Sequence, residues 1–199
     1  MTDTLDHSET ALIEALANAR RGFTGRQSLY AKNLATGAIV AIDSDTEVAT
    51  ASVIKIAIMA ALYHEIDRGR FTEDQLLTMT EADRRFGTGV IRDLTVGRQF
   101  SAFDLCRLMI VLSDNTATRM LIELIGLDRI NEIVRGWGFE ITELRYATWA
   151  RPDPRSYAVS TAFEMATLLE RIDAGTLVSE SSTRATLQHL RDQQDHAQL

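Results

Sequence analysis

The sequence is poor in the residues that cross-link a chain or bind metal. Its single cysteine, Cys106, has no partner within the chain for a disulfide, and the four histidines, at positions 7, 64, 189 and 196, lack the spacing of a zinc site. Two prolines and eleven glycines exclude a collagen-like or proline-rich architecture. No run of about 18 apolar residues is present to cross a bilayer. We therefore expect no metal, no cofactor and no membrane partner.

Positive charge is also scarce. The chain of 199 residues has 21 basic against 28 acidic residues, a net charge of -7, which is opposite to the charge of a nucleic-acid binder. The 45% hydrophobic and 25% charged content is typical of one soluble globular domain. The N-terminal residues are acidic and show no basic segment followed by an apolar one, so the sequence as written predicts a cytoplasmic protein. A missing leader would instead place it in the periplasm or outside the cell.

The spacing of apolar residues predicts a mixed α/β chain. Two short strands, at 28–33 and 38–43, flank a turn of hairpin composition. The segment 52–67 is apolar nearly all round and should form a buried helix at the centre of the fold. Further helices are expected at 9–22, 103–112, 117–125, 127–135, 161–172 with Ser160 as N-cap, and 182–192. Cys106 is expected to be a small core residue.

A lysine inside the apolar helix is the first candidate for chemistry. Only two of the 21 basic residues are lysines, and one of them, Lys55, lies in this helix three residues after Ser52. A desolvated lysine can lose its proton and act as a base, whereas an arginine cannot. The spacing puts both side chains on one helix face, with Ser52 at the helix start where free N–H groups favour negative charge. The alternative interpretation is an N-cap serine beside a lysine that reaches to the surface.

The tripeptide Ser113-Asp114-Asn115 is the second candidate. It follows the apolar run LMIVL, and a given tripeptide is expected by chance in only a few per cent of chains of this length, by rough frequency arithmetic. Taken in isolation, it is equally consistent with a turn between two helices, which these residue types stabilise through side-chain to backbone hydrogen bonds.

Together the two motifs, in this order and 61 residues apart, resemble the active-site pattern of the class A β-lactamases and of the penicillin-binding serine hydrolases that share their fold. The resemblance covers nearly the whole chain, including TASVIKIAIMAALY, the GTGV at 87–90, SDNTA and STAFEMATLLERI. It implies an α/β fold of the α+β type, in which a helical region packs on an antiparallel sheet.

The resemblance also implies a role for each motif residue. Ser52 would be the acylated nucleophile, with its own backbone N–H as one oxyanion donor. Lys55 would accept the Ser52 proton directly or through water, and Ser113 would relay a proton to the leaving nitrogen. Asp114 would be structural. The substrate-binding residues would be Asn115, which holds the amide side chain of the substrate, and Gly87, Thr88 and Gly89 at the cleft rim.

Two features of that family are absent from this sequence. Between residues 144 and 160 there is no Glu-x-x-Leu-Asn segment, and Asp153, between two prolines, is the only carboxylate. The Lys-Thr-Gly motif is missing as well, because no lysine follows Lys55. These departures predict that residues 1–199 form a single domain without its C-terminal strands. Only the first hairpin of the sheet would remain, with an uncovered strand edge that promotes self-association.

The expected activity is therefore that of a serine hydrolase that forms an acyl-enzyme on Ser52. Its partner would be a small-molecule amide or ester of β-lactam type, and β-lactam hydrolysis is the leading hypothesis. A penicillin-binding or esterase-like relative with slow deacylation is a second hypothesis. A non-catalytic remnant of the fold is a third.

Overall fold

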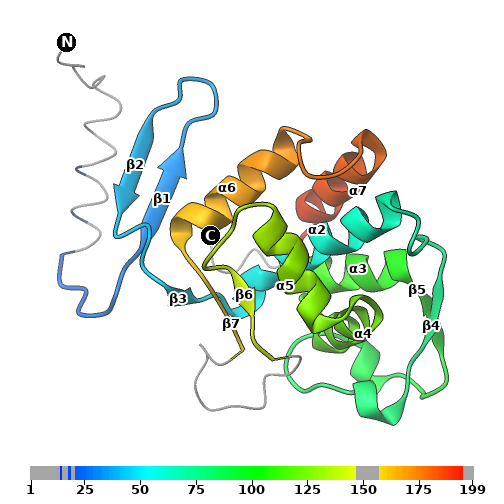
Figure 1. Ribbon diagram of the computed structural model, residues 1–199. Helices are drawn as coiled ribbons and strands as arrows, with labels where there is room; N and C mark the ends of the chain where they lie inside the picture. Colours follow the sequence, from blue (N-terminus) through cyan, green and yellow to red (C-terminus); the bar gives the residue numbers. More distant parts are fainter. Residues whose placement is uncertain (1–13, 15–17, 19–20, 147–156, 195–199) are drawn as a thin grey trace.

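The computed structural model describes residues 14, 18, 21–146 and 157–194 (Figure 1). The helix expected at 9–22 lies almost entirely outside the described residues, and so does Asp153. A β-hairpin stands at one side of the molecule beside α6, and the remaining helices form a compact body on the other side of α6 (Figure 1).

The described helices agree with the sequence expectations to within a few residues at each end. The six helices described are α2 (Ile54–Asp67), α3 (Ala102–Val111), α4 (Asn115–Ile125), α5 (Leu127–Gly136), α6 (Ala162–Asp173) and α7 (Glu180–Arg191). Short 3-10 turns are η1 (Ala51–Val53), η2 (Glu81–Asp83) and η3 (Ile91–Asp93).

The predicted hairpin is present as β1 (Leu29–Lys32) and β2 (Ile39–Ile42), antiparallel with Leu29 opposite Ile42. It is attached to α6 by an ion pair of 2.6 Å between Lys32 and Glu170, and by an edge-to-face contact between Tyr30 and Phe163. In the described part of the chain, β1 and β2 form a sheet of their own.

Two further small sheets were not predicted from the sequence. β4 (Leu76–Thr78) pairs with β5 (Gln99–Ser101), and β7 (Ala158–Ser160) lies between β3 (Val48–Ala49) and β6 (Glu143–Leu144), all antiparallel. Their strands have only two or three residues, too few to show an alternating pattern. The β3–β7 pairing matters most, because β3 leads directly into η1 and α2 and so fixes where the central helix begins.

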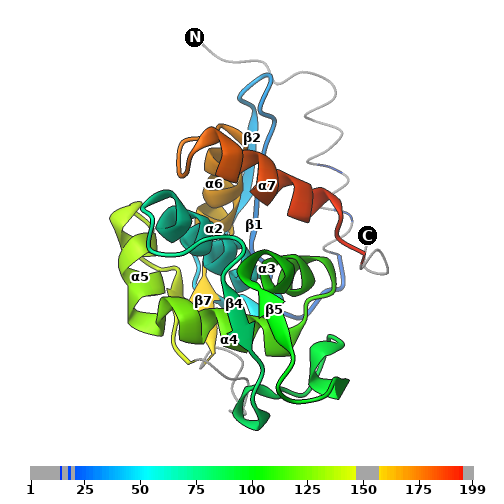
Figure 2. The ribbon, with the colours of Figure 1, turned by 90° about the vertical axis from the view of Figure 1, so that its right-hand side faces the viewer.

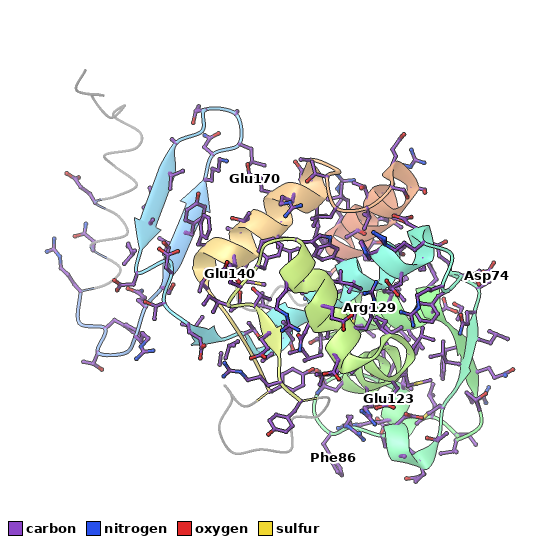
Figure 3. The ribbon with its side chains drawn as sticks, in the orientation of Figure 1. Asp74, Phe86, Glu123, Arg129, Glu140 and Glu170 are labelled. Carbon is purple, nitrogen blue, oxygen red and sulfur yellow. The ribbon has the colours of Figure 1, made fainter. Side chains whose placement is uncertain are left out.

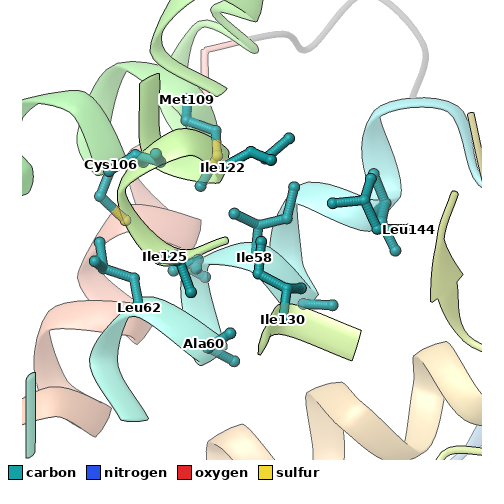
Figure 4. Packing of buried hydrophobic residues seen from close by; sticks show 14 of the residues in the cluster. Ile58, Ala60, Leu62, Cys106, Met109, Ile122, Ile125, Ile130 and Leu144 are labelled. Atoms are coloured by element: carbon teal, nitrogen blue, oxygen red, sulfur yellow. The ribbon is translucent and has the colours of Figure 1, made fainter. Parts of the chain in front are cut away.

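The helix α2 is the centre of the core, as its composition predicts. Helices α3, α4, α5 and α7 all contact it and surround it (Figure 2). The Cys106 side chain is fully buried among these helices, which confirms the expectation for that residue. Figure 4 shows the packing of apolar side chains that α2 shares with its neighbours, among them Ile58, Leu62, Met109, Ile122 and Ile130.

Several predicted helix starts are wrong in detail: α2 begins at Ile54, with Ser52 in the preceding 3-10 turn, and α7 begins at Glu180, two residues earlier than expected. The side chain that caps α6 is Thr161, which accepts from the Glu164 N–H at 3.0 Å, and Ser160 is the last residue of β7. The helix α4 starts at Asn115, two residues earlier than expected, because Asp114 caps it. Among the described helices none has the length and apolar character needed to span a membrane.

Candidate active site

Ser52 lies in η1, the single 3-10 turn that runs into α2, and its side chain is exposed. The preceding residue, Ala51, has a φ of +45°, a backbone conformation that a non-glycine residue adopts only at a cost of about 1–2 kcal/mol. The Thr50 N–H donates to the Ala158 carbonyl at 3.3 Å and so continues the β3–β7 pairing up to this turn. The short sheet therefore holds the sharp turn that presents Ser52.

Lys55 follows in the first turn of α2, and its residue is only 2% exposed. Its ammonium group donates to three acceptors: the Ser113 carbonyl oxygen at 2.7 Å, Ser113 Oγ at 2.9 Å and Asn115 Oδ1 at 2.9 Å. Burial lowers the pKa of Lys55 to about 8, while the nearby Asp114 carboxylate acts to raise it. Such an amine can be deprotonated near neutral pH, as a general base requires.

Ser113 lies between the other two side chains. Its hydroxyl donates to Ser52 Oγ at 2.9 Å and accepts from Lys55 at the same distance. Its φ of +55° again belongs to the left-handed region, which is rare for a serine and typical of strained functional positions. In the described part of the chain, the hydrogen-bonded path from Ser52 to Lys55 thus runs through Ser113.

Asp114 is the structural centre of the turn between α3 and α4. One carboxylate oxygen accepts from the Thr116 and Ala117 N–H groups, both at 2.9 Å, and caps α4. The other accepts from Val90 and Ile91 at 2.6 and 2.9 Å. A single buried carboxylate therefore joins the start of α4 to the glycine-containing loop, in agreement with the structural role that the resemblance implies.

The loop Gly87-Thr88-Gly89 packs directly on the SDN turn. Gly89 has a φ of +109°, and a Cβ built there would lie 2.6 Å from the Asp114 Cα; one at Gly87 would lie 2.5 Å from Asn115 Nδ2. Only glycine permits this approach. The Thr88 Oγ1 donates to the Ser113 carbonyl oxygen at 2.6 Å, and the Thr88 carbonyl oxygen accepts from the Asn115 N–H at 3.1 Å.

Asn115 uses both ends of its side chain within the protein. Its Oδ1 accepts from Lys55, and its Nδ2 donates to the Phe86 carbonyl oxygen at 2.9 Å. The residue is 8% exposed. The structure thus brings together every predicted site residue: Ser52, Lys55, Ser113, Asn115, Gly87, Thr88 and Gly89. Their catalytic and binding roles stay predictions.

Two contributions to the site were missed from the sequence. The Thr88 hydroxyl and the Phe86 carbonyl were not expected to bond the SDN residues, because the partners lie 25 and 29 positions apart in the sequence and leave no local signal. Asp153, the only carboxylate between residues 144 and 160, lies outside the described residues. In the described part of the chain no group of three or more potential ligands is arranged to hold a metal ion.

Similarity to known proteins identifies the family. A curated relative, the β-lactamase regulatory protein BlaB of Streptomyces cacaoi, is 31% identical over 129 residues, which are 63% of this chain and 40% of that protein. The solved β-lactamase of Sphaerobacter thermophilus DSM 20745 superposes with a TM-score of 0.87 at 28% identity, over 96% of this chain and 71% of that one. A variant of PBP-A, solved as an acyl-enzyme complex with penicillin G, gives a TM-score of 0.82 at 29% identity, over 92% of this chain and 69% of that one.

The chain therefore spans about two fifths of the length of this curated relative. The family model described as the β-lactamase enzyme family matches residues 11–199, which is nearly all of this sequence. With this match and the fold of the solved relatives, the chain belongs to the β-lactamase enzyme family.

Proposed function

We propose that this protein is a serine hydrolase that forms an acyl-enzyme on Ser52, with a β-lactam or a related small amide or ester as acyl donor. The observation that carries the proposal is the path from the exposed Ser52 hydroxyl through Ser113 Oγ to the buried Lys55 amine, with 2.9 Å at each step. An activated nucleophile needs a base within this reach.

The reaction follows from the geometry. Ser52 Oγ attacks the carbonyl carbon of the acyl donor, and its proton passes to Ser113 Oγ as the proton of Ser113 passes to the neutral Lys55 amine. When the C–N bond of the donor breaks, the same groups return a proton to the leaving nitrogen. The backbone N–H of Ser52 would support the oxyanion. A pKa of about 8 leaves roughly a tenth of Lys55 neutral at pH 7, which is enough for a base that acts once per acylation.

Slow deacylation is a second candidate function, because the sequence lacks the Glu-x-x-Leu-Asn segment that supplies the water-activating base in the class A enzymes. A protein of this kind would acylate once and release its product slowly, as a penicillin-binding protein does. The solved PBP-A acyl-enzyme with penicillin G supports the idea that a related fold accumulates such an adduct.

One experiment tests acylation and separates the candidates. The full chain is incubated with benzylpenicillin, its intact mass is measured over time, and nitrocefin turnover is followed in parallel. A stable adduct on the Ser52 peptide indicates slow deacylation, and sustained nitrocefin turnover indicates a β-lactamase. Ser52→Ala should abolish both signals. If the unmodified chain shows neither an adduct nor turnover with either compound, acylation of β-lactams by Ser52 is wrong and a non-catalytic module is left.

A further inference from the structure

A pocket lies next to the loop Gly87-Thr88-Gly89. It has a volume of about 280 Å³ and is lined by Arg84, Arg85, Phe86, Arg92 and Asp93. Three of its five lining residues are cationic, although the chain as a whole has a net charge of -7. Side chains of this kind, half-buried around an apolar ring, are suited to an organic anion.

Two of the three guanidinium groups keep capacity for a ligand. Arg84 is engaged, since it pairs with Glu81 at 3.0 Å and donates to the Leu94 carbonyl oxygen. Within the described ranges Arg92, by contrast, has only a loose contact of 3.5 Å with the exposed Asp93.

Arg85 donates from Nη1 to the carbonyl oxygens of Ala82 and Arg84 and pairs with no carboxylate among the described residues. Its buried Nε has no hydrogen-bond partner there. Burial and the neighbouring Arg119 lower the pKa of Arg85, against the opposing effects of the Asp83 and Glu123 carboxylates, and an anion in the pocket would further stabilise the charged form.

The pocket is tied to the candidate active site through its own backbone. The Phe86 carbonyl oxygen accepts from Asn115 Nδ2, and the Arg85 N–H donates to Thr116 Oγ1 at 3.1 Å. The Phe86 side chain is 93% exposed at the lower edge of the molecule in Figure 3, while its carbonyl is fixed. The pocket therefore shares its loop contact with Asn115, the residue that is predicted to hold the amide of the substrate.

We propose that Arg85 and Arg92 form an anion subsite for the acyl side chain of the donor, which makes the preferred substrates those that carry a carboxylate next to an apolar or aromatic group. The claim that the anion is part of a substrate rests on the proposed function. The claim that the arginines bind an anion rests on the pocket alone. Asp93 opposes the anion, so its removal should strengthen the subsite.

The test uses a matched pair of acyl donors. Carbenicillin is benzylpenicillin with one further carboxylate on the acyl side chain. We expect the ratio of their second-order acylation rate constants to be about fivefold to tenfold in favour of carbenicillin for the unmodified protein. The ratio should fall to about one in the R85Q/R92Q double variant and should rise in D93N. Arg135→Gln on α5, which removes an exposed charge outside the pocket, should leave the ratio as it is.

A ratio that stays the same in R85Q/R92Q and in D93N, while benzylpenicillin still acylates Ser52, would overturn the proposal.

Failure of both penicillins to acylate is a failure of the proposed function, and a direct binding measurement then tests the subsite. In S52A, phenylmalonate should bind more tightly than phenylacetate. When R85Q and R92Q are added to S52A, the two acids should bind equally. Equal binding of the two acids to S52A itself would overturn the subsite. The arginines could bind phenylmalonate while R85Q/R92Q leaves the ratio of the carbenicillin and benzylpenicillin rate constants unchanged. That result would assign the pocket to a separate anion and would overturn the substrate subsite.

Discussion

Thr88 donates a hydrogen bond of 2.6 Å to the carbonyl oxygen of Ser113, the same oxygen that accepts from the Lys55 ammonium at 2.7 Å. Two donors thus share one acceptor on a residue with a φ of +55°. The Thr88 hydroxyl both holds this strained carbonyl in place and weakens it as an acceptor for the positive charge of Lys55.

Removal of the Thr88 hydroxyl should slow acylation and change its pH dependence. In Thr88→Val the Ser113 carbonyl oxygen no longer accepts from residue 88 and accepts more strongly from the Lys55 ammonium. The pKa of Lys55 should therefore rise, and the acylation rate at pH 7 should fall about fivefold to tenfold. The measurement is the pH profile of acylation by benzylpenicillin. Thr88→Ser keeps the hydroxyl and should restore both the rate and the profile. A slower rate with an unshifted profile would mean that Thr88 only supports the fold.

The pH profile of the unmodified protein tests Lys55 as the base. Burial lowers the pKa of Lys55 to about 8, and only the neutral amine accepts a proton, so the acylation rate should rise with pH and reach half its maximum near pH 8. Lys55→Arg keeps the charge but cannot lose it, and should reduce acylation by at least about a hundredfold. A profile that is flat between pH 6 and 9 would contradict this role.

Substitution of Gly89 should destabilise the protein more than a positive φ alone explains. Gly89→Ala places a Cβ against Asp114, in addition to the strain of a φ of +109°, and should cost about 3 kcal/mol or more of unfolding free energy. Gly97 is a matched control, because its φ is +88° but a Cβ there would meet nothing within 4 Å. Gly97→Ala should cost only about 1 kcal/mol. Urea unfolding of the two variants compares the costs directly.

The buried His189 predicts a loss of stability in mild acid. It is 1% exposed and shares a hydrogen bond of 2.9 Å with the Tyr63 hydroxyl. Burial, with a smaller effect of Arg107, lowers the pKa of His189 to about 4, against a weaker opposing effect of Asp192. Because the unfolded histidine binds a proton already near pH 6.5, the folded state should lose up to about 3 kcal/mol as the pH falls from 6.5 toward 4.

His189→Gln has no such titration and should flatten this pH dependence, although its stability at pH 7 is expected to be lower. Urea unfolding of both proteins between pH 7.5 and 4.5 provides the measurement. This range ends above the ordinary pKa of Asp67 and at that of Glu65, and the fold lowers both pKa values, so those carboxylates add to the slope only at the acid end of the range. Parallel curves for the two proteins would show that His189 does not control acid stability.

The helices could be predicted from the sequence because each repeats a local signal along several turns. The central helix is apolar on every side, and Gly69 follows its end; Gly126 marks the end of α4 in the same way. The short strands β3, β6 and β7 carry no such repetition. Their pairing brings Val48 opposite Ser160 and Glu143 opposite Val159, and tertiary structure alone decides these partners.

The residues of the candidate site that belong to its sequence motifs were predictable. Ser52, Lys55 and Ser113 were identified from residue type and spacing together with the family resemblance. The sequence could not show that Asn115 holds both Lys55 and the Phe86 carbonyl, because those contacts depend on how the loop before η3 packs on α4. Arg85 and Arg92 were not singled out either, since isolated arginines in an arginine-rich chain have no pattern.

The four hydrogen bonds of Asp114 have a consequence for motion. The amides of Val90, Ile91, Thr116 and Ala117 belong to two separate segments, yet all end on one carboxylate. Opening of the loop that carries Val90 and Ile91 breaks their two hydrogen bonds. The amides of Thr116 and Ala117 are then bonded to a carboxylate that has lost half of its donors. In hydrogen exchange the four amides should therefore behave as one cooperative unit, so that the protein loses the order of its cleft rim and of its SDN turn in a single event.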